Sequence, residues 1–523
     1  MVTIGGKGVF SQTDNSLIIV QKENRLFIAC VLALVATSFG FVLRALLLNT
    51  IGVDLNLTET QKGALGGAGL FPFALSIIFF SLIVDRIGYG TAMAFAWVGH
   101  VASAIITITA HSYQQLYVGT LIFALANGTI EAVVNPVTTT LFSRNKTHRL
   151  NILHSGWAGG LVLGGLLAIA MSGFGWRAKI GLFLIPALIY GALMIGQKFP
   201  VQERVSAGVS YADMLKEFGW ASCFIVCWFI CLAINLVCDA FHGHFLVPGY
   251  EFLSAAVYAL LPTILFAVKY KSFGRPMFVL LLLIMTLSAT TELGTDTWIS
   301  DLLTPAMKQL GLQAGWVLVY TSAIMLALRL SAGPLVHRLS PLGLLAAGSA
   351  LCAAGLLWIA HAGAVAGIIF LAATLYGVGK TFFWPTMLGV VSEQFPKGGA
   401  LTLNAIGGMG MIAVGALGGP ILGTLQDVAF DKNLQQANPA IHQTVAKPAE
   451  TKFGMTFQAL DKKKIEALPE PEKVTVNKIT GDASQATLAT VAVLPAIMCA
   501  CYVGLIFYFK SRGGYKQIQL SET

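Results

Sequence analysis

The sequence predicts an all-α polytopic membrane protein with fourteen transmembrane helices, arranged as two six-helix bundles plus two extra central helices. Three observations predict this class. Only 11% of the 523 residues are charged, whereas a soluble domain averages about 25%. Hydrophobic residues make up 56% of the chain. Apolar runs recur with the length of about 20 residues that crosses the hydrocarbon core of a bilayer. This composition excludes a disordered protein, a nucleic-acid-binding tail protein and an ordinary cytosolic enzyme.

The apolar runs fall into groups of six, two and six along the chain. The first six lie at about 26–49, 61–84, 89–111, 114–142, 149–173 and 175–198. Two more follow at about 220–238 and 251–268. The last six lie at about 276–300, 314–336, 341–361, 365–391, 400–426 and 485–509.

These runs define the expected domains. We expect a cytoplasmic segment at 1–25, an N-terminal six-helix bundle at 26–198, a linker with two additional transmembrane helices at 199–275, a C-terminal six-helix bundle at 276–510 and a cytoplasmic tail at 511–523. A polar segment at 427–484 interrupts the second bundle, and its composition predicts a mostly flexible extracytoplasmic insertion. Short loops rich in Lys and Arg, such as 143–149 and 269–275, mark the cytoplasmic side. The sequence therefore predicts a multi-pass protein of the inner (plasma) membrane with both termini in the cytoplasm.

The two groups of six repeat each other. Asn135-Pro136 in the fourth run of the first group matches Trp384-Pro385 in the fourth run of the second, about 250 residues later. Leu150-Asn151 and Leu403-Asn404 match in the fifth runs at nearly the same offset. Duplication of this kind is how many secondary transporters are built, with the substrate site between the halves near the bilayer midplane.

Four charged residues stand out within the apolar runs: Arg44, Glu131, Glu292 and Lys380. A charge at the centre of a span costs at least about 2.5–3.5 kcal/mol, so each one is a functional hypothesis. The repeat places opposite charges at equivalent positions of the two halves twice: Arg44 corresponds to Glu292, and Glu131 corresponds to Lys380. We expect the four to converge on one cavity, with the glutamates carrying protons and the two cations contacting the substrate. The alternative is a pair of buried salt bridges that only hold the halves together.

Polar and aromatic side chains accompany these charges. Asn135 lies one turn from Glu131, and Asn151, His154 and Trp157 follow an i, i+3, i+6 spacing. Such a stripe suits a sugar, whose hydroxyls need hydrogen bonds and whose CH faces stack on aromatic rings. The substrate-binding candidates are thus Asn135, Asn151, His154, Trp157, Trp298 and Trp384, together with Arg44 and Lys380. Packing roles for the tryptophans and for His154 stay open, and Arg329 is expected to be a gate or a helix-end anchor.

We expect no cofactor and no metal site. The eight cysteines all lie in or beside apolar segments, where they behave as small apolar residues. No zinc-ligand spacing, paired carboxylates or Ser/His/Asp order occurs in a soluble stretch, so we expect the protein not to be an enzyme.

The helix pattern and one loop carry a family resemblance. Val84-Asp-Arg-Ile-Gly88, after the second run, resembles the Gly-x-x-x-Asp-Arg-x-Gly loop of the major facilitator superfamily, with Ser81 at the first glycine. This resemblance implies the major facilitator fold and a gating loop at Asp85 and Arg86. It covers nearly all of both six-helix groups but neither the helices at 220–268 nor the insertion.

A narrower resemblance is to the fucose–proton symporter family. Glu131-Ala-Val-Val-Asn135-Pro136 and Arg149-Leu-Asn151 are similar to its helices 4 and 5, and the resemblance implies Glu131 as proton carrier and Asn151 in the sugar site. The Glu292 to Trp298 stretch resembles its Gly-x-Glu-x-x-x-x-x-Trp segment, with Thr290 in place of glycine. Phe383-Trp-Pro-Thr386 and Gly418-Gly-Pro420 also fit its second half.

Two residues depart from that family. Arg44 stands where the family has a helix-1 aspartate, and Lys380 replaces a small or polar residue. These cations favour a substrate with an anionic group, or they pair with the two glutamates.

The expected function is secondary active transport of a sugar or sugar-derived solute across the inner membrane by alternating access, coupled to protons through Glu131. The expected partners are a small-molecule substrate, H⁺ and the lipid bilayer, with no nucleic acid, and we expect a monomer. One alternative is an organic-anion or drug carrier of the same fold, with Arg44 and Lys380 binding the anion. Another is a non-transporting membrane sensor whose outer insertion contacts a partner.

Overall fold

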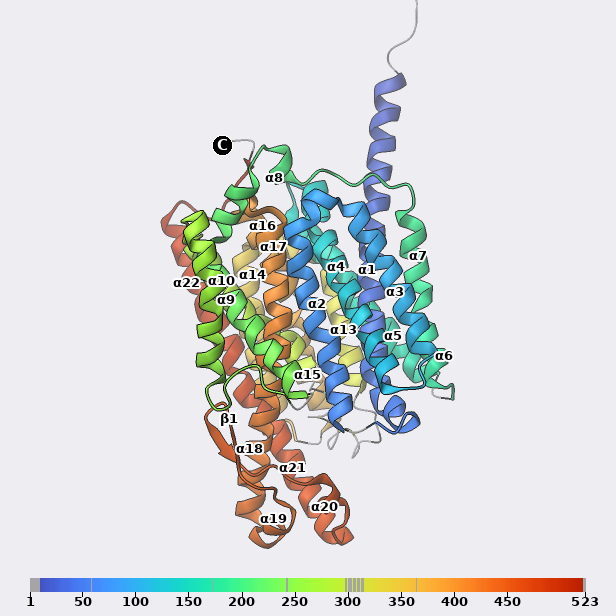
Figure 1. Ribbon diagram of the computed structural model, residues 1–523, viewed down its shortest axis with the longest axis vertical. Helices are drawn as coiled ribbons and strands as arrows, with labels where there is room; N and C mark the ends of the chain where they lie inside the picture. Colours follow the sequence, from blue (N-terminus) through green and yellow to red (C-terminus); the bar gives the residue numbers. More distant parts are fainter. Residues whose placement is uncertain are drawn as a thin grey trace, which may run out of the picture.

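A computed structural model of the chain describes residues 10–520, except 58, 172, 241–242, 297–298, 300–302, 304–306, 308–310, 312–314 and 364. Long helices run roughly parallel to one another and form two bundles side by side (Figure 1). Thirteen helical spans in the described part are long and apolar enough to cross a membrane. Helices satisfy their backbone hydrogen bonds internally, which is what a lipid environment demands of a spanning segment.

The first half contains the six spans expected from the sequence. Its helices are α1 (Phe10–Asp54), α2 (Glu59–Ile87), α3 (Tyr89–Ile108), α4 (Tyr113–Leu141), α5 (Lys146–Ala170), α6 (Trp176–Gly181) and α7 (Leu184–Met194). The sixth span is made by α6 and α7 together. Ser112 caps α4, because its Oγ accepts a hydrogen bond from the backbone N–H of Gln115.

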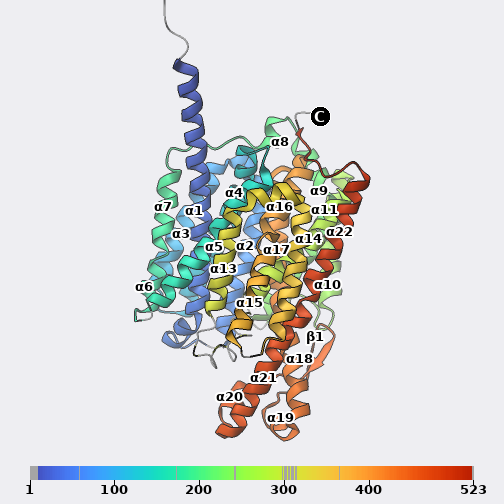
Figure 2. The same cartoon turned by 180° about the vertical axis from the view of Figure 1, so that it is seen from behind.

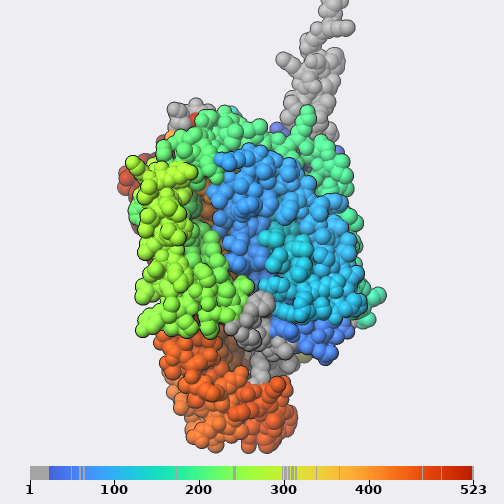
Figure 3. Space-filling model, viewed as in Figure 1, coloured from blue at the N-terminus to red at the C-terminus, as the bar shows by residue number. Residues whose placement is uncertain are grey.

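The linker contributes the two extra helices. The short α8 (Glu203–Ser206) precedes α9 (Tyr211–Ala240) and α10 (Glu251–Tyr270), which pack on each other. Gly219 has φ 73° and kinks α9, and a Cβ there would lie 2.1 Å from the backbone N of Gly274. Glycine is therefore required where α9 crosses the loop after α10. The α9–α10 pair forms a layer beside the first half in Figure 3, where α9 packs on α2 and α17.

The second half is more broken than the first. Its elements are α11 (Pro276–Ala289), the π-helix η1 (Thr290–Gly294), α13 (Gly315–Leu330), α14 (Ala332–Ala360), α15 (Ala366–Lys380), α16 (Phe383–Gln394), the 3-10 turn η2 (Pro396–Gly398), α17 (Gly399–Ala413), the π-helix η3 (Val414–Gly418), α18 (Gly419–Ala437), α21 (Glu470–Val491) and α22 (Val493–Ser511). The expected span at 314–336 is here the 16-residue helix α13, followed by the first turns of α14. The structure thus shows thirteen spans of full length, and the fourteenth predicted span is a shorter apolar helix.

The insertion is folded, so the expectation of a mostly flexible segment is wrong. Helices α18 and α21 extend beyond the bundle and carry α19 (Pro439–Val445), α20 (Lys462–Glu466) and an antiparallel hairpin of β1 (Glu450–Lys452) and β2 (Met455–Phe457). Four buried apolar residues form a separate small core: Leu434, Ile441, Val445 and Val476. Leu434, Ile441 and Val445 lie within twelve residues of one another and Val476 comes from α21, so no continuous apolar run predicts this core.

The termini and the insertion lie at opposite ends of the bundle. In Figures 1 and 2 the beginning of α1 and the end of α22 are at the top, and α18 to α21 project at the bottom. We call these ends the terminal side and the insertion side.

Close helix packing joins the elements around the centre. Helix α2 contacts α17, and α5 contacts α1, α13 and α16. A Cβ at Gly160 in α5 would lie 2.0 Å from Ser38 Oγ of α1, and one at Gly156 would lie 2.4 Å from the carbonyl oxygen of Val31. The glycine face of α5 therefore lets α1 approach at backbone distance, as small residues do in membrane helix pairs.

The two repeat-related asparagines cross the interface between the halves in the same manner. Asn151 in α5 donates to Thr386 Oγ1 in α16 at 3.3 Å. Asn404 in α17 donates to the carbonyl oxygen of Ala132 in α4 at 2.9 Å. Each fifth helix thus bonds to the fourth helix of the opposite half, which supports the internal duplication read from the sequence.

Candidate functional site

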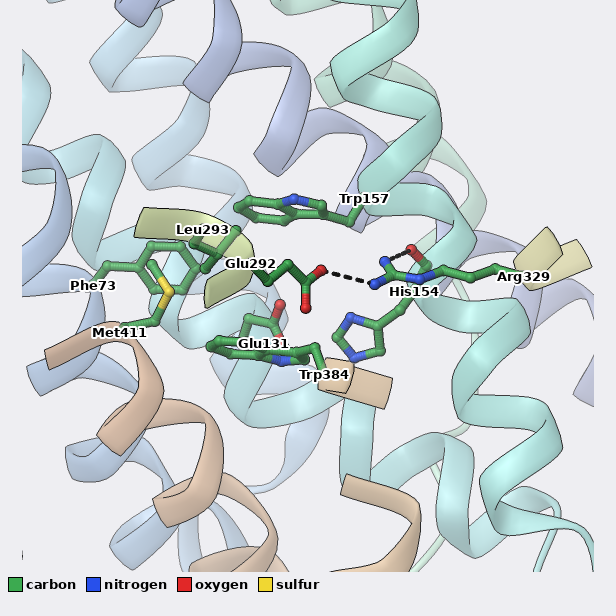
Figure 4. A pocket seen from close by; sticks show the side chains of 9 residues that line it. All are labelled: Phe73, Glu131, His154, Trp157, Glu292, Leu293, Arg329, Trp384 and Met411. Carbon is green, nitrogen blue, oxygen red and sulfur yellow. Dashed lines mark hydrogen bonds and ion pairs between the residues drawn. The ribbon is translucent and has the colours of Figure 1, made fainter. Parts of the chain in front are cut away.

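A small pocket lies where the two halves meet, and we call it the inner pocket. It is lined by Phe73, Glu131, His154, Trp157, Glu292, Leu293, Arg329, Trp384 and Met411 (Figure 4). Its volume of about 20 Å³ has room for about one water molecule. Five of the predicted site residues meet here, from α4, α5, η1 and α16. Sequence reasoning did not place Arg329, Phe73, Leu293 or Met411 in the site.

Arg329 is the central cation of the inner pocket. Its Nη2 pairs with Glu292 Oε1 at 2.9 Å, and the side chains of both residues are buried. Its Nε donates to the carbonyl oxygen of Thr381 at 2.6 Å, and its Nη1 donates to that of His154 at 3.0 Å. Arg329 therefore belongs to the second half but bonds to a helix of the first. Arg329, and not the repeat-related Arg44, is therefore the cation that pairs with Glu292.

Glu131 ends a chain of hydrogen bonds within the first half. Asn135 Nδ2 donates to Glu131 Oε2 at 2.8 Å, and His154 Nε2 lies 2.9 Å from Asn135 Oδ1. Glu131 is 4% exposed and His154 is 2% exposed. Asn135, one turn after Glu131, thus lies on the same helix face. The carboxyl of Glu131 is thus held by a neutral amide, while Arg329 on the same pocket wall is bonded to Glu292.

Two indole rings border the pocket from opposite sides. In Figure 4, Trp157 and Trp384 lie on either side of the Glu292 carboxylate. Among the described residues, two buried polar atoms here have no hydrogen-bond partner, the Nε1 donor of Trp384 and the Oε2 acceptor of Glu292. A buried polar group without a partner is costly, so such atoms call for an explanation. One donor and one acceptor in the same pocket match the needs of a hydroxyl group.

A much larger outer cavity adjoins the inner pocket on the insertion side. It measures about 820 Å³ and is lined by the second half of α1, the first turns of α2 and parts of α4, α9, α17 and η3. Trp157, Leu293 and Met411 line both spaces, so the two are neighbours separated by these side chains. Most of the outer wall is apolar, and the charged residues in its described part are Arg44 and Asp296.

Arg44 and Lys380 do not reach the inner pocket. Arg44 lines the outer cavity, with its guanidinium 3.8 Å from the ring centre of Phe123. Lys380 is fully buried and its Nζ pairs with Asp296 Oδ1, to which Tyr376 Oη also donates at 3.2 Å. The expectation that Arg44 or Lys380 lies beside Glu131 is therefore wrong. The four charges do not converge on one cavity. Lys380 forms its ion pair with Asp296, and Glu292 forms its ion pair with Arg329.

The remaining predicted site residues lie elsewhere. Asn151 is buried at the interface of the halves and bonds to Thr386, outside the lining of the inner pocket. Trp298 lies outside the described residues. Arg329 carried a usable signal, since it is a cation within an apolar run. Because Gly333-Pro334 follows one turn later, the sequence predicted a gate or a helix-end anchor and not a place in the site.

The predicted gating loop is held by the linker on the terminal side. Asp85 pairs with Arg204 Nη2, and both side chains are at least nine-tenths buried. Arg86 lies over the ring of Tyr211 at 4.8 Å. Nearby, Lys146 at the start of α5 pairs with Glu203 at 2.6 Å and donates to the carbonyl oxygen of Ser392 at 3.3 Å. These contacts tie the first half, the linker and the second half together.

The tail completes this closure. Glu393 at the end of α16 accepts hydrogen bonds from Thr147 Oγ1 of α5 at 2.6 Å and from Tyr515 Oη at 2.8 Å. Gln517 Nε2 donates to the carbonyl oxygen of Ser143 in the first half at 2.6 Å. The molecule is thus closed on the terminal side and hollow on the insertion side.

No group of three or more metal-binding side chains occurs within the part of the chain that the structure describes. Cys223 and Cys227 on α9 have their sulfurs 4.0 Å apart, both as free thiols. In the inner pocket, Glu292 is paired with Arg329, and the Glu131 carboxyl and the His154 imidazole are both bonded to the Asn135 amide.

Two helical halves with a buried polar site between them, closed at one end and hollow at the other, define a multi-pass membrane transporter. The chain belongs to the Major Facilitator Superfamily, whose model matches residues 28–420. It is therefore a secondary transporter of small molecules and not an enzyme. No match is found among the curated proteins.

Solved structures of several transporters share the fold. The human organic anion transporter MFSD10 (TETRAN) matches with a TM-score of 0.56 and 14% identity, over 92% of this chain and 99% of that chain. The E. coli fucose:proton symporter FucP matches with a TM-score of 0.52 and 16% identity, over 90% and 98%. The proton:xylose symporter XylE matches with a TM-score of 0.57 and 14% identity, over 92% and 96%. At such low identities the likeness shows the fold alone.

Proposed function

We propose that this transporter moves a sugar or sugar-derived solute by alternating access and couples the movement to protons through Glu131. The observation that carries the proposal is the outer cavity of about 820 Å³, which Trp157 separates from the inner pocket, where Trp384 has a free donor and Glu292 a free acceptor. Sugar rings stack on tryptophan through their CH faces, and their hydroxyls both donate and accept hydrogen bonds. The names of two structural neighbours, symporters of fucose and xylose with protons, agree with this choice.

The geometry also suggests how a proton would be coupled. A carboxyl that carries a proton needs surroundings that change between the two states of the transporter. Glu131 contacts the neutral amide of Asn135, whereas the Arg329 guanidinium is bonded to Glu292 and to the carbonyl oxygen of His154. Separation of the halves on the terminal side would move α13 against α5 and break the bond between Arg329 and His154. Arg329 can then redistribute between Glu292 and Glu131, which favours loss of the proton from Glu131. Glu292 thus acts in coupling by holding Arg329 in one state.

The orientation follows from the same proposal. With the Lys- and Arg-rich loops and both termini in the cytoplasm, the outer cavity faces outward and the terminal-side contacts form the inner gate. Each of the two halves contributes to one site within a single chain, so a monomer suffices for this cycle. We place the protein in the inner (plasma) membrane.

The proposal is tested with the purified protein in liposomes. Uptake of a panel of radiolabelled sugars and sugar acids is measured with and without an inward proton gradient, for the wild type, Glu131→Gln and Glu470→Gln. The control makes the same chemical change at an exposed side chain of the insertion. We expect gradient-driven accumulation in the wild type and the control, and none in Glu131→Gln. Full gradient-driven uptake by Glu131→Gln contradicts the role given to this carboxyl.

One observation favours a second candidate, an organic-anion carrier of the same fold. Arg44 lines the outer cavity and makes no ion pair with a described acidic residue. Lys380 does not support this candidate, because Asp296 already neutralises it.

A further inference from the structure

We infer that Arg44 is the anion-recognition residue of the outer cavity, and that the transported solute carries a carboxylate group. The solute would then be a sugar acid and not a neutral sugar. This inference rests on the proposed function, and it narrows the substrate class for the same transport path.

The other buried cations near the path are already neutralised. Arg329 pairs with Glu292 at 2.9 Å, and Lys380 pairs with Asp296. Arg44 differs, because all its hydrogen bonds go to neutral groups. It donates to the carbonyl oxygen of Gly40 at 3.3 Å, to Ser103 Oγ at 2.8 Å and to Thr107 Oγ1 at 3.5 Å.

The surroundings hold the guanidinium in place without compensating its charge. Its plane lies over Phe123, 3.8 Å from the ring centre, with Phe183 at 5.6 Å. Ser103 Oγ donates in turn to the carbonyl oxygen of Gly119 at 2.7 Å, which leaves its lone pairs for Arg44. Arg44 Nε is buried and has no partner among the described residues. A charge at bilayer depth is costly, and an approaching anion offsets that cost.

The outer cavity offers an anion one uncompensated positive charge. Among the described residues its lining contains two charged ones, Arg44 and Asp296, and Asp296 is paired with Lys380. The volume of about 820 Å³ accommodates a monosaccharide acid with its hydration. Trp157 forms the wall shared with the inner pocket and contacts Phe41 at a ring distance of 5.9 Å. A carboxylate bound at Arg44 therefore places the sugar ring next to the indole that borders the inner pocket.

The direction of selectivity follows from the chemistry of the guanidinium. Arginine binds a carboxylate through two parallel charge-assisted hydrogen bonds, which are roughly twice as strong as neutral ones. A neutral sugar makes no such pair. Lysine at position 44 keeps the charge but loses the planar fork.

The test measures thermal unfolding of the purified protein in nanodiscs with three probes: glucuronate, glucose and benzoate. A ligand that binds only the folded state raises the unfolding temperature, so the shift reports affinity. The variants are Arg44→Gln and Arg44→Lys. The control is Arg144→Gln, which removes an exposed arginine in a loop on the terminal side.

We expect glucuronate to stabilise the wild type and Arg144→Gln more than glucose does. Its affinity should fall at least about tenfold in Arg44→Gln and less in Arg44→Lys, with the weak effect of glucose unchanged. If the glutamine variant does not fold, the lysine variant decides, because a weaker response to glucuronate alone is still expected.

The other outcomes separate the two proposals. If glucose and glucuronate stabilise the protein equally, and neither Arg44 variant changes this, the anion subsite is refuted while the proposed sugar transport is retained. Arg44-dependent stabilisation by benzoate alone supports the anion subsite and refutes the sugar. Stabilisation by none of the three probes overturns both.

Discussion

Replacing Arg329 with methionine removes the cation that links the two halves at the inner pocket. Three bonds are lost: the ion pair with Glu292 and the bonds to the carbonyl oxygens of Thr381 and His154. The side chain of Glu292 is only 3% exposed, so it is left as a buried charge without compensation. Removing one partner of a buried ion pair costs about 3–5 kcal/mol of folding free energy. We expect a loss of this size in Arg329→Met.

A second substitution separates charge imbalance from lost packing. In Arg329→Met combined with Glu292→Leu, both charges are gone, and replacing a whole buried pair with apolar residues is often neutral or stabilising. Thermal unfolding in detergent should therefore show a large loss for the single variant and recovery for the double one. Transport should stay absent in both, because the coupling cation is missing. A single variant as stable as the wild type would refute the central place given to this ion pair.

Three further changes test other parts of the molecule. Burial and the nearby Glu393 carboxylate raise the pKa of Tyr515 well above its ordinary value of about 10. The tail contact is thus fully present below pH 10 and weakens as the pH rises further. Tyr515→Phe should weaken this contact by about 1 kcal/mol, seen as faster proteolysis of the tail. Gly160→Ala should lower thermal stability by about 1–3 kcal/mol, because its Cβ would lie 2.0 Å from a facing hydroxyl, whereas Gly504→Ala, with open space around it, should not. Leu434→Ala should destabilise the insertion core by about 2–5 kcal/mol, seen as faster proteolysis of the insertion with no loss of transport.

The sequence predicted the helical framework well because hydropathy in a membrane protein is a direct physical signal. Thirteen of the expected runs correspond to spans of full length. The duplication was also recoverable, since Asn151 and Asn404 occupy matching places and each donates a hydrogen bond to the fourth helix of the opposite half.

The pairing of charges was not recoverable, and the reason is geometric. A repeat offset gives the depth of a residue along its helix but not which neighbouring helix it faces. Glu292 lies in the π-helix η1, and such a turn shifts the rotational phase of the residues that follow. Asp296, which follows η1, pairs with Lys380, and Arg329 of α13 pairs with Glu292. A prediction that assumes a regular α-helical period therefore misses the ion-pair partners of both Glu292 and Lys380.

The sequence predicted only part of the lining of the inner pocket. Glu131, His154 and Trp157 were found because polar and aromatic residues are rare in an apolar run. Phe73 and Met411 look like ordinary membrane residues, and only the fold shows that they line the site. The folded insertion was missed because its core consists of single, spaced apolar residues and not of a continuous apolar run.

The central claim is that Glu131 carries the coupling proton through a site between the halves. The most direct test compares two modes of transport in liposomes for Glu131→Gln, using the labelled solute that the wild type accumulates. Counterflow exchanges solute across the membrane without a proton gradient, whereas accumulation against a concentration gradient needs the proton. We predict that Glu131→Gln keeps counterflow and loses proton-driven accumulation. Accumulation at the wild-type level, or loss of both modes in a folded protein, would contradict the claim.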